Sequence, residues 1–587
     1  MLSSLRRSKR FDDRIYQSVP QWTVEQGAVS LTSANFQSLS ATAGFVNFQI
    51  QSPSKAVYLD RKVDWQMTVT VAMSVDCTQV TVPAPFAVAT PGRDFSLCSY
   101  PLHALTNSMS ATICDQQVST NLAQNREIMD RLTDSPMDRE WSCSPTALDL
   151  YADNNEAYGS LQNPMQGFDS STTFQTIGNG AWPIIFTDPS GAPASSVVTG
   201  YTDANNNVIV FDVATGVPKW VSNASTTPSA VLLYFQFTSS EPLQCSPFIW
   251  KDVMERRTGL SQLQNLNVSM TIQSAQQAKL LRCTSANQRS VNSYVLNPIG
   301  GSPFQQGTAS LFCQFLSPPM TAELPYQPVN TVEYQGITAY VYPCVAPLAT
   351  GPRTIQVTTQ TLSLNTVPDW LVIAVQPTPA YSASQEAINQ GTWYMPILSA
   401  NVTWSNVTGL LSNLTQQQLF QICKCNGLKQ PYAQWRGYAQ TSSSEVAAQT
   451  AWLTGGPLIL RPGVDVTLPP GVASGQSNGQ WTFSIQLTID ASAVPAAVLN
   501  GMAGKMQTTV LAINSGFFST SSGTSRVVTG PIPGPAGGTN PENPYALAGI
   551  PSAGPLMRPS VLQLTDGDRI PGGGRAPRRM RMSDRLR

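Results

Sequence analysis

The stretch AVYLDRKVDWQMTVTVAMSV, residues 56–75, decides the fold class of this chain. Apolar side chains occupy every second position from Val63 to Val75, and the positions between them are mostly polar or small. Successive side chains of a β-strand point to opposite faces of a sheet, so this alternation predicts one long, half-buried strand.

Similar apolar or alternating runs recur along most of the chain, and clusters of Gly, Pro, Asn and Ser separate them. The further predicted strands are 47–51, 208–214, 230–237, 265–272, 310–316, 336–342, 354–364, 370–375, 400–404, 457–461, 481–489 and 508–513. The chain is therefore predicted to be all-β.

Only two segments have a helical pattern, 122–132 and 414–425. The first has Thr120 or Asn121 as its candidate N-cap, and the second has Ser412 or Asn413. The second helix is expected to end at Asn426-Gly427. Its predicted inward side chains are Leu419, Phe420 and Cys423.

These two helices belong to an internal repeat. Residues 101–132 and 396–423 each contain a Pro-led turn, a strand, a polar loop, an Asn-Leu pair and a helix. Further on, Pro-Leu turns precede the alternating strands at 265–272 and 481–489. The first half is longer because of a segment at about 137–230, which is rich in Ser, Gly, Asn and Pro and is expected to be an irregular surface excursion.

Two similar β modules, each with one short helix, favour two tandem eight-stranded jelly rolls with long surface loops. A propeller would need more repeats, and immunoglobulin-like domains would be shorter and would lack the helix. The expected divisions are a basic lead-in (1–44), a first roll with the 137–230 insertion (45–290), a second roll (291–525) and a Pro/Gly-rich arm with an Arg-rich end (526–587).

Charge is concentrated at the two ends of the chain. The 587 residues contain 34 basic and 34 acidic side chains, but the segment between residues 14 and 569 has a net charge of −9. Basic ends of this kind are either solvated tails or sites that contact a polyanion such as nucleic acid. The candidate contact residues are Arg6, Arg7, Lys9 and Arg10 at the N-terminus and Arg569, Arg575, Arg578, Arg579, Arg581, Arg585 and Arg587 at the C-terminus.

Enzyme chemistry has little support in the sequence. The single histidine, His103, lies in PLHALTNS, which is expected to be the entry to a strand. One histidine excludes a zinc site with two of them, and neither a phosphate-binding Gly-rich loop nor a G-x-S-x-G nucleophile elbow occurs. No catalytic residue, metal site or cofactor is therefore predicted.

The ten cysteines are scattered and include no CxxC pair. Without a secretory signal or a long apolar span, buried reduced thiols are expected. Cys423 and Cys425 form a CxC pair, but residues two apart on a helix point in different directions, which favours packing over metal binding.

Three stretches carry a resemblance to a known family. They are YPLHALTNSMSATICDQQVSTNLAQNREIMDRL (100–132), EPLQCSPFIWKDVMERRTGLSQLQNLNVSMTI (241–272) and MPILSANVTWSNVTGLLSNLTQQQLFQICKCNGL (395–428). In pattern and order, they resemble the double jelly-roll major capsid proteins of Polinton-like viruses, adintoviruses and virophages, with adenovirus hexon as a distant relative. The resemblance covers about residues 45–520.

The resemblance implies a structural protein of the virion, assembled inside the host cell. It implies a homotrimer that forms a pseudo-hexagonal capsomer and tiles an icosahedral shell around the genome. Its partners would be neighbouring capsomers and other capsid proteins such as penton and minor or cement proteins. Chain ends in such capsids tend to lie on the inner face, where basic residues could meet the genome or an internal membrane.

Two other classes remain open at the level of sequence. An RNA-virus capsid protein with one shell jelly roll and a protruding domain would share the composition, but it would not give two similar halves. A glycan-binding β-sandwich adhesin would use exposed aromatic side chains, for which Trp393, Tyr432 and Trp435 are candidates, although core packing is the favoured role for them.

Overall fold

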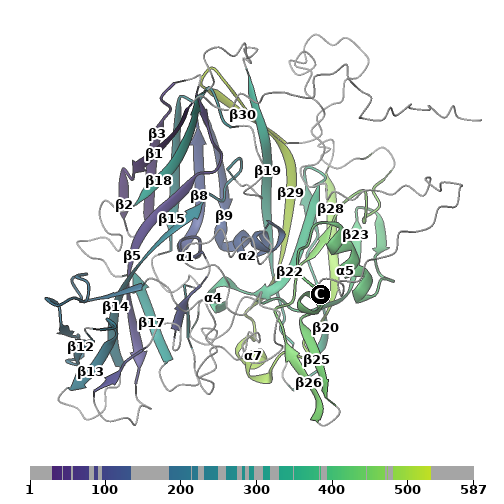
Figure 1. Ribbon diagram of the computed structural model, residues 1–587. Coiled ribbons are helices and arrows are strands. Elements are labelled where there is room, and N and C mark those ends of the chain that lie inside the picture. The colour runs from purple at the N-terminus through teal and green to yellow at the C-terminus, as the bar shows by residue number, and fades with distance from the viewer. Residues whose placement is uncertain are drawn as a thin grey trace, which may run out of the picture.

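The computed structural model of this protein describes the two β modules and the short connections within them (Figure 1). The described residues are 30–42, 44–54, 57–77, 85–89, 95–98, 100–133, 184–212, 214–222, 230–248, 259–273, 280–283, 290–296, 309–317, 329–347, 350–382, 384, 393–443, 446–469, 472 and 480–529.

Eight strands of the first module form two facing sheets. They are β1 (Ser30–Gln37), β3 (Phe45–Gln51), β5 (Asp64–Asp76), β8 (Thr106–Ile113), β9 (Gln116–Asn121), β14 (Ala230–Pro242), β15 (Asn265–Ile272) and β18 (Ser310–Ser317). Their order is β1-β18-β5-β14 in one sheet and β3-β15-β8-β9 in the other. Numbered along the chain, the strands lie in the orders 1-8-3-6 and 2-7-4-5.

The second module repeats this arrangement. Its strands are β19 (Asn330–Cys344), β20 (Thr354–Thr358), β22 (Trp370–Pro377), β23 (Ile397–Trp404), β24 (Val407–Leu410), β27 (Leu458–Leu460), β28 (Trp481–Asp490) and β29 (Met506–Ser521). Their order is β19-β29-β22-β27 and β20-β28-β23-β24, which is again 1-8-3-6 and 2-7-4-5. The predicted pair of eight-stranded jelly rolls is confirmed.

The remaining elements extend or connect these sheets. The extra strands are β2 (Ser40–Thr42), β4 (Tyr58–Leu59), β6 (Phe86–Ala87), β7 (Phe95–Leu97), β10 (Ile184–Thr187), β11 (Gly200–Thr202), β12 (Val208–Phe211), β13 (Pro218–Ser222), β16 (Leu281–Cys283), β17 (Ser290–Leu296), β21 (Leu362–Leu364), β25 (Tyr438–Ser443), β26 (Val446–Trp452) and β30 (Thr524–Thr529). The helices are α1 (Pro101–Leu105), α2 (Leu122–Thr133), α4 (Pro379–Ser382), α5 (Gln416–Cys425), α6 (Tyr432–Arg436) and α7 (Ala496–Gly501).

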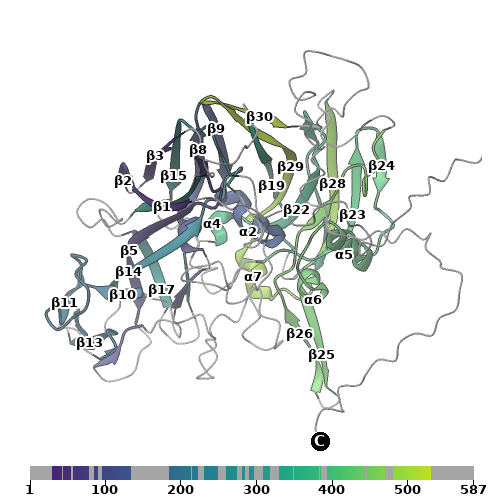
Figure 2. The ribbon, with the colours of Figure 1, turned by 45° about the horizontal axis from the view of Figure 1, so that its top comes forward.

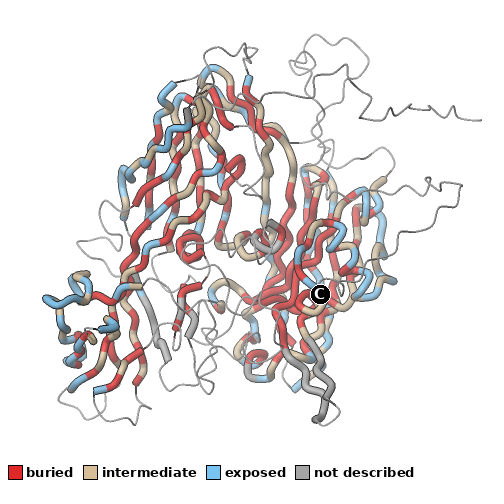
Figure 3. The backbone as a smooth tube through the Cα atoms, in the orientation of Figure 1, coloured by how far each residue is buried: buried red, intermediate tan, exposed pale blue. Residues whose placement is uncertain are grey.

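Strand β5 shows why the alternation fixes the fold. Its apolar positions are all buried, and Val69 and Val71 are fully inaccessible. On the opposite face Thr70 is also buried, and Thr68 shares a hydrogen bond of 2.8 Å with Thr238 of the neighbouring strand β14. The strand is therefore buried on both faces at its centre, more deeply than the expected half-buried strand. Figure 3 shows buried residues along the strands of both rolls.

Both predicted helices are present, but the start of the second one was wrong. Helix α5 begins after Thr415, whose hydroxyl accepts a hydrogen bond from Gln418 N, while the Gln418 side chain accepts one from Thr415 N. This reciprocal capping box holds the helix start more firmly than Ser412 or Asn413 could. As predicted, the helix ends at Asn426, and Leu419, Phe420 and Cys423 are its buried side chains.

The internal repeat is confirmed by the turns that precede both helices. Strands β8 and β9 are joined by Cys114 and Asp115, and strands β23 and β24 by Ser405 and Asn406. The first residue of each turn has a positive φ, 55° for Cys114 and 49° for Ser405. The same two-residue connection therefore occurs at the same place in each roll.

The strand pairings place two limits of the first roll at other residues than the sequence predicted. Strands β17 and β18 pair with β5, so the first roll continues to Ser317 and does not end at residue 290. Strand β1, within the expected lead-in, pairs with β18 over its whole length. These are pairings between distant segments, which no local pattern in the sequence reveals.

Part of the 137–230 insertion is more regular than expected. Strand β10 adds to the first sheet, and β11, β12 and β13 form a small sheet together with β6. This small sheet buries Ile209, Phe211 and Trp220. The part of the insertion between residues 134 and 183 lies outside the described residues.

The long connections gather at one end of both rolls. In each module they follow the third, fifth and seventh strands, and they carry the small sheets of the first roll and the β25–β26 hairpin of the second. Figure 1 shows β12, β13, β25 and β26 at this end, and Figure 2 shows the same grouping after rotation. The short turns of β8–β9 and β23–β24 lie at the opposite end because neighbouring strands are antiparallel.

Candidate functional surface: the seam between the two rolls

Helix α2 joins the two rolls by packing into both cores. Leu122 at its start belongs to the core of the first roll. Ile128, Met129 and Leu132 from later turns belong to the core of the second roll. Figure 1 shows α2 lying between the two modules. The repeat predicted this helix, but not that its far end would fill the other module.

The second roll reaches back in the same way. Val332 of β19 and Phe518 of β29 are buried in the core of the first roll. Close by, Gln335 N donates a hydrogen bond of 2.8 Å to Ser246 Oγ. Thr520 Oγ1 donates one of 2.8 Å to Ser261 O. The two modules therefore exchange apolar side chains across one seam, and hydrogen bonds between side chains and backbone cross it as well.

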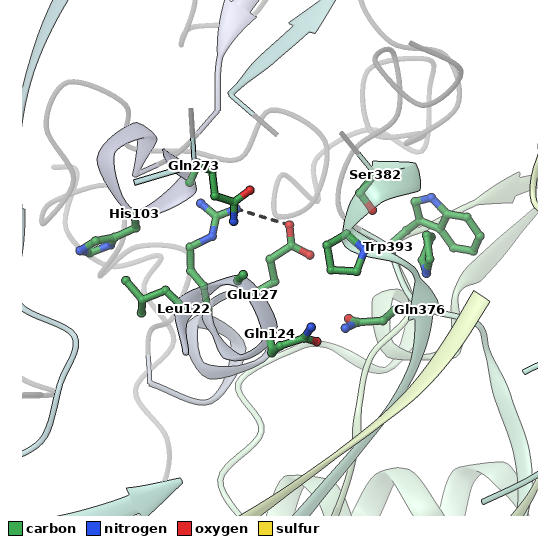
Figure 4. Close-up of a pocket in the computed structure, with 13 residues that line it drawn as sticks. His103, Leu122, Gln124, Glu127, Gln273, Gln376, Ser382 and Trp393 are labelled. Carbon is green, nitrogen blue, oxygen red and sulfur yellow. Dashed lines mark hydrogen bonds and ion pairs between the residues drawn. The ribbon is translucent and has the colours of Figure 1, made fainter. Parts of the chain in front are cut away.

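A small cavity of about 60 Å³ lies in this seam (Figure 4). Gln124 and Arg126 of α2 line it from the first roll, and Gln376 and Trp393 line it from the second. A water molecule needs about 10–15 Å³, whereas pockets for organic ligands span roughly 300–1,000 Å³. The cavity therefore has room for a few water molecules but not for a substrate or an organic cofactor.

His103 also borders the cavity. As expected, it lies at the entry to a strand, β8, although the residues there form a helical turn. It lies in the one-turn helix α1 and is almost completely buried. His103 Nε2 is 2.7 Å from Pro242 O, which fixes that nitrogen as the protonated donor. Its Nδ1 faces Glu241 Oε2 at 3.4 Å. The short helix forms because Pro101 starts it and Glu241 accepts hydrogen bonds of 2.7 Å from both Leu102 N and His103 N.

Burial sets the protonation of this pair. It lowers the pKa of His103 to about 3, so the imidazole is neutral at pH 7. Burial raises the pKa of Glu241 to about 7, although hydrogen bonds from Leu102 N, His103 N and Ser239 oppose the rise. The pair ties α1 to strand β14, and its closure from solvent makes it an anchor within the core.

Glu241 was missed in the sequence as a partner of His103, yet a signal was present. Along β14 the buried positions are the odd-numbered ones from Val231 to Glu241. A carboxylate in phase with the inward face of an apolar strand must find buried partners. The alternation predicts its burial, but not which donors it meets.

The cysteines agree with the expectation of packing. Cys423 is buried, and its Sγ accepts a hydrogen bond of 3.3 Å from Ile459 N, whereas Cys425 is exposed. Within the described residues, no group of three His, Cys, Asp or Glu side chains is arranged to hold a metal ion. Cys143 lies outside those residues.

The aromatic candidates for glycan stacking serve the core, as the favoured interpretation held. Trp393 and Trp435 are nearly inaccessible, and Trp435 Nε1 donates a hydrogen bond of 2.8 Å to Pro457 O. Tyr432 is half-buried against Phe420, with ring centroids 5.1 Å apart.

The basic candidates at both ends, Arg6 to Arg10 and Arg569 to Arg587, lie outside the described residues. Among the described helices, none is long and apolar enough to cross a membrane. The features that this part of the chain does provide are two repeated rolls and a tightly packed seam.

Comparisons with known proteins agree with these features. Residues 5–316 match the family model of the Sputnik virophage major capsid protein first domain, and residues 335–516 match that of the major capsid protein V20 C-terminal domain. The putative capsid protein V20 of Sputnik virophage is 24% identical over 482 residues, which are 80% of this chain and 71% of that protein.

Two solved structures share the fold. A chain in the cryo-EM structure of the Sputnik virophage matches with a TM-score of 0.65 and 20% identity, over 90% of this chain and 94% of that one. The crystal structure of the mavirus major capsid protein matches with a TM-score of 0.58 and 12% identity, over 90% of this chain and 95% of that one.

Proposed function

This chain belongs to the Sputnik-type family of virophage major capsid proteins, and from that premise we propose that three copies assemble into a pseudo-hexagonal capsomer. Each chain supplies two of six similar rolls, so three chains complete a closed ring. With 63.2 kDa per chain, the capsomer has a mass of roughly 190 kDa. Such capsomers would tile an icosahedral shell around the genome.

The observation that carries this proposal is the identical strand order of the two rolls. Both have the orders 1-8-3-6 and 2-7-4-5. Two equivalent modules in one chain give a trimer six similar sides. Neighbouring capsomers can then meet through related surfaces in six directions.

In this proposal the end with the long connections faces outward. Surface loops tolerate insertions better than packed strands, and this end carries the added sheets of the first roll and the β25–β26 hairpin of the second. The basic chain ends face inward, where phosphate groups of the genome are available. The protein is then a structural component of the virion and not an enzyme.

The Arg-rich C-terminus has two candidate roles. Its seven arginines, from Arg569 to Arg587, can clamp the acidic body of a neighbouring subunit or contact the genome. We favour the clamp, because the body carries a net charge of −9 between the two basic ends. The partners would be further copies of the chain and other shell proteins.

Removing residues 569–587 distinguishes these roles. Under the clamp, the truncated protein keeps its capsomer but fails to form shells even without nucleic acid. Under genome contact, the intact protein binds DNA with a strong salt dependence that the truncated protein loses. If both assembly and DNA binding are unchanged, neither role holds.

Negative-stain images of the purified full chain test the capsomer itself. We expect particles of uniform size with a hexagonal outline in the face-on view and six similar lobes. Particles with only two lobes would overturn the proposal.

A further inference from the structure

The first roll has one edge strand that the second roll covers. Strand β9 is the last strand of its sheet, and β30 of the second module lies beside it near the β8–β9 turn (Figure 2). The contact is fixed at the β8–β9 turn, where Ser525 N donates a hydrogen bond of 2.5 Å to Asp115 Oδ1. At the other end of β9, α2 enters the core of the second roll. The strand edge and the helix thus form one contact face.

Among the described residues, the equivalent face of the second roll is exposed and no other element covers it. Strand β24 is the matching edge strand, and its residues are exposed except for the partly buried Leu410. Val407 is 40% exposed, and Asn406, which corresponds to Asp115, is also exposed. On α5 the outward residues include Gln417 and Gln421. We call β24 together with the outward side of α5 the β24–α5 face.

A second surface of the first roll is left open in a complementary way. Within the chain, the first roll contacts the second along the first half of β19, where Asn330 and Val332 are buried. Strand β19 is the edge strand of its sheet, and its equivalent in the first roll is β1. There, Leu31 is 57% exposed, and Leu39 just beyond the strand is 64% exposed.

We infer that the β24–α5 face of one copy of this chain binds the β1 edge of a second copy. The inference rests on the proposed capsomer and names the surfaces that join its subunits. The seam inside one chain is the template. On the first roll it involves β9 and α2, and on the second roll it involves β30 and the first half of β19. Among the described residues, the matching surfaces that the seam leaves exposed are the β24–α5 face on the second roll and the β1 edge on the first.

The two surfaces differ, so the contact is head-to-tail. Such a contact closes into a ring when the rotation between neighbours permits it, and duplicated rolls repeat nearly the same rotation at every joint. The α5 side is richer in polar residues than the matching side of α2, which presents Ile128, Met129 and Leu132 to the second core. The contact between chains should therefore be wetter than the seam within the chain.

One substitution on each surface tests the inference. Val407→Asp places a carboxylate on the β24–α5 face, and Leu31→Asp places one on the β1 edge. Both side chains are partly exposed in the single chain, so each variant should fold. In the assembly each carboxylate would be buried without a partner, and we expect the subunit dissociation constant to rise by roughly 100-fold or more.

Val197→Asp is the matched control, because Val197 is 87% exposed and lies among the long connections at the other end of the roll. Sedimentation velocity of the full chain measures assembly, and circular dichroism confirms folding. We expect monomers for Val407→Asp and Leu31→Asp and wild-type oligomers for Val197→Asp. If either interface variant keeps the wild-type mass at all concentrations, the inference is overturned while the capsomer stands. A monomeric wild-type protein would instead contradict the capsomer itself.

Discussion

The two rolls have the same strand order but use their helices differently. In the second roll, α5 packs its side chains Leu419, Phe420 and Cys423 into its own module. In the first roll, α2 extends from its own core into that of the second. The same strand–turn–strand–helix unit therefore serves as a local cover in one module and as the link between modules in the other.

This difference shows which parts of a duplicated fold are free to change. Strand order depends on alternating side chains that must be buried in both rolls, so it is retained. The connections contribute less to each core and have acquired separate roles. The first roll carries the small sheet of β11, β12, β13 and β6, whereas the second carries the β25–β26 hairpin.

The largest expected effect comes from a charge at the centre of either roll. Strands β5 and β22 are the third strands of their rolls. Val69 of β5 and Ile373 of β22 both have inaccessible side chains. Val69→Asp or Ile373→Asp would bury an unpaired carboxylate, at a cost of several kcal/mol. We expect loss of soluble, folded protein in both cases, measured by yield and circular dichroism. Gln66→Asp, at an exposed position of β5, should fold normally. Normal melting of Val69→Asp would contradict the strand assignment.

The next effect separates the two helices. Ile128→Ala and Leu419→Ala each empty a fully buried site in the second core and should cost about 2–5 kcal/mol of unfolding free energy. Only Ile128→Ala should also speed amide hydrogen exchange in α2, because only Ile128 belongs to the link between modules. Denaturant unfolding and hydrogen exchange measure the two effects.

The control for this pair is Gln421→Ala, which lies on the exposed side of α5. Its unfolding free energy should stay within about 0.5 kcal/mol of the wild type. A cost for Ile128→Ala as small as that of Gln421→Ala would show that α2 does not support the second core.

Protonation offers a third contrast, because the Glu241–His103 pair lies in the first roll. The pKa of Glu241 is raised from 4.5 to about 7, so its stabilisation is present below about pH 4.5 and is lost as the pH rises through 7. The pKa of His103 is lowered from 6.5 to about 3, so stability is lost as the pH falls from 6.5 toward 3. Between pH 4.5 and 6.5 the two trends oppose each other.

Glu241→Gln removes the pH dependence of stability that is due to Glu241 and leaves the one that is due to His103. Relative to the wild type, this variant should gain unfolding free energy as the pH rises from 4.5 to 7, by an amount on the order of 3 kcal/mol. Urea unfolding at a series of pH values measures this difference, in which other titrating groups cancel. A difference that does not change with pH would show that folding does not raise the pKa of Glu241. Asp203→Asn, in the insertion, provides a control carboxylate away from the pair.

The strands and their repetition could be predicted from the sequence because they depend on local alternation. The long strand around Val69 and both helices were found in this way. The pairing of β1 with β18 was not, because it joins residues that are nearly 300 positions apart and leaves no periodic signal. The helical turn of His103 before β8 was not predicted for a related reason: the acceptor that holds this turn, Glu241, is distant in the sequence.

The seam could be predicted only in part. The repeat located α2, but Ile128 and Leu132 fit the inward side of a helix whichever core they enter. The direction of that side is decided by the neighbouring module. The sequence shows that basic residues are concentrated at both ends of the chain. The contacts of these residues with a neighbouring subunit or with the genome stay predictions.

The smallest expected effect tests the capping box of α5. Thr415→Ala removes the side-chain acceptor of Gln418 N and should cost about 1 kcal/mol. Thr415→Ser retains the hydroxyl and should recover most of that stability. Because α2 is held at both ends by packing in two cores, α5 should be the more sensitive helix to the loss of a cap. Equal stability of the Ala and Ser variants would show that the cap contributes little.

The native mass of the purified, full-length protein tests the central claim most directly. Two equivalent rolls per chain and the inferred pair of contact surfaces predict a closed trimer of roughly 190 kDa that persists at micromolar concentration. Native mass spectrometry across a dilution series should show this species and its monomer, with no dimer of comparable abundance. A uniform monomer of 63.2 kDa at every concentration would contradict the account.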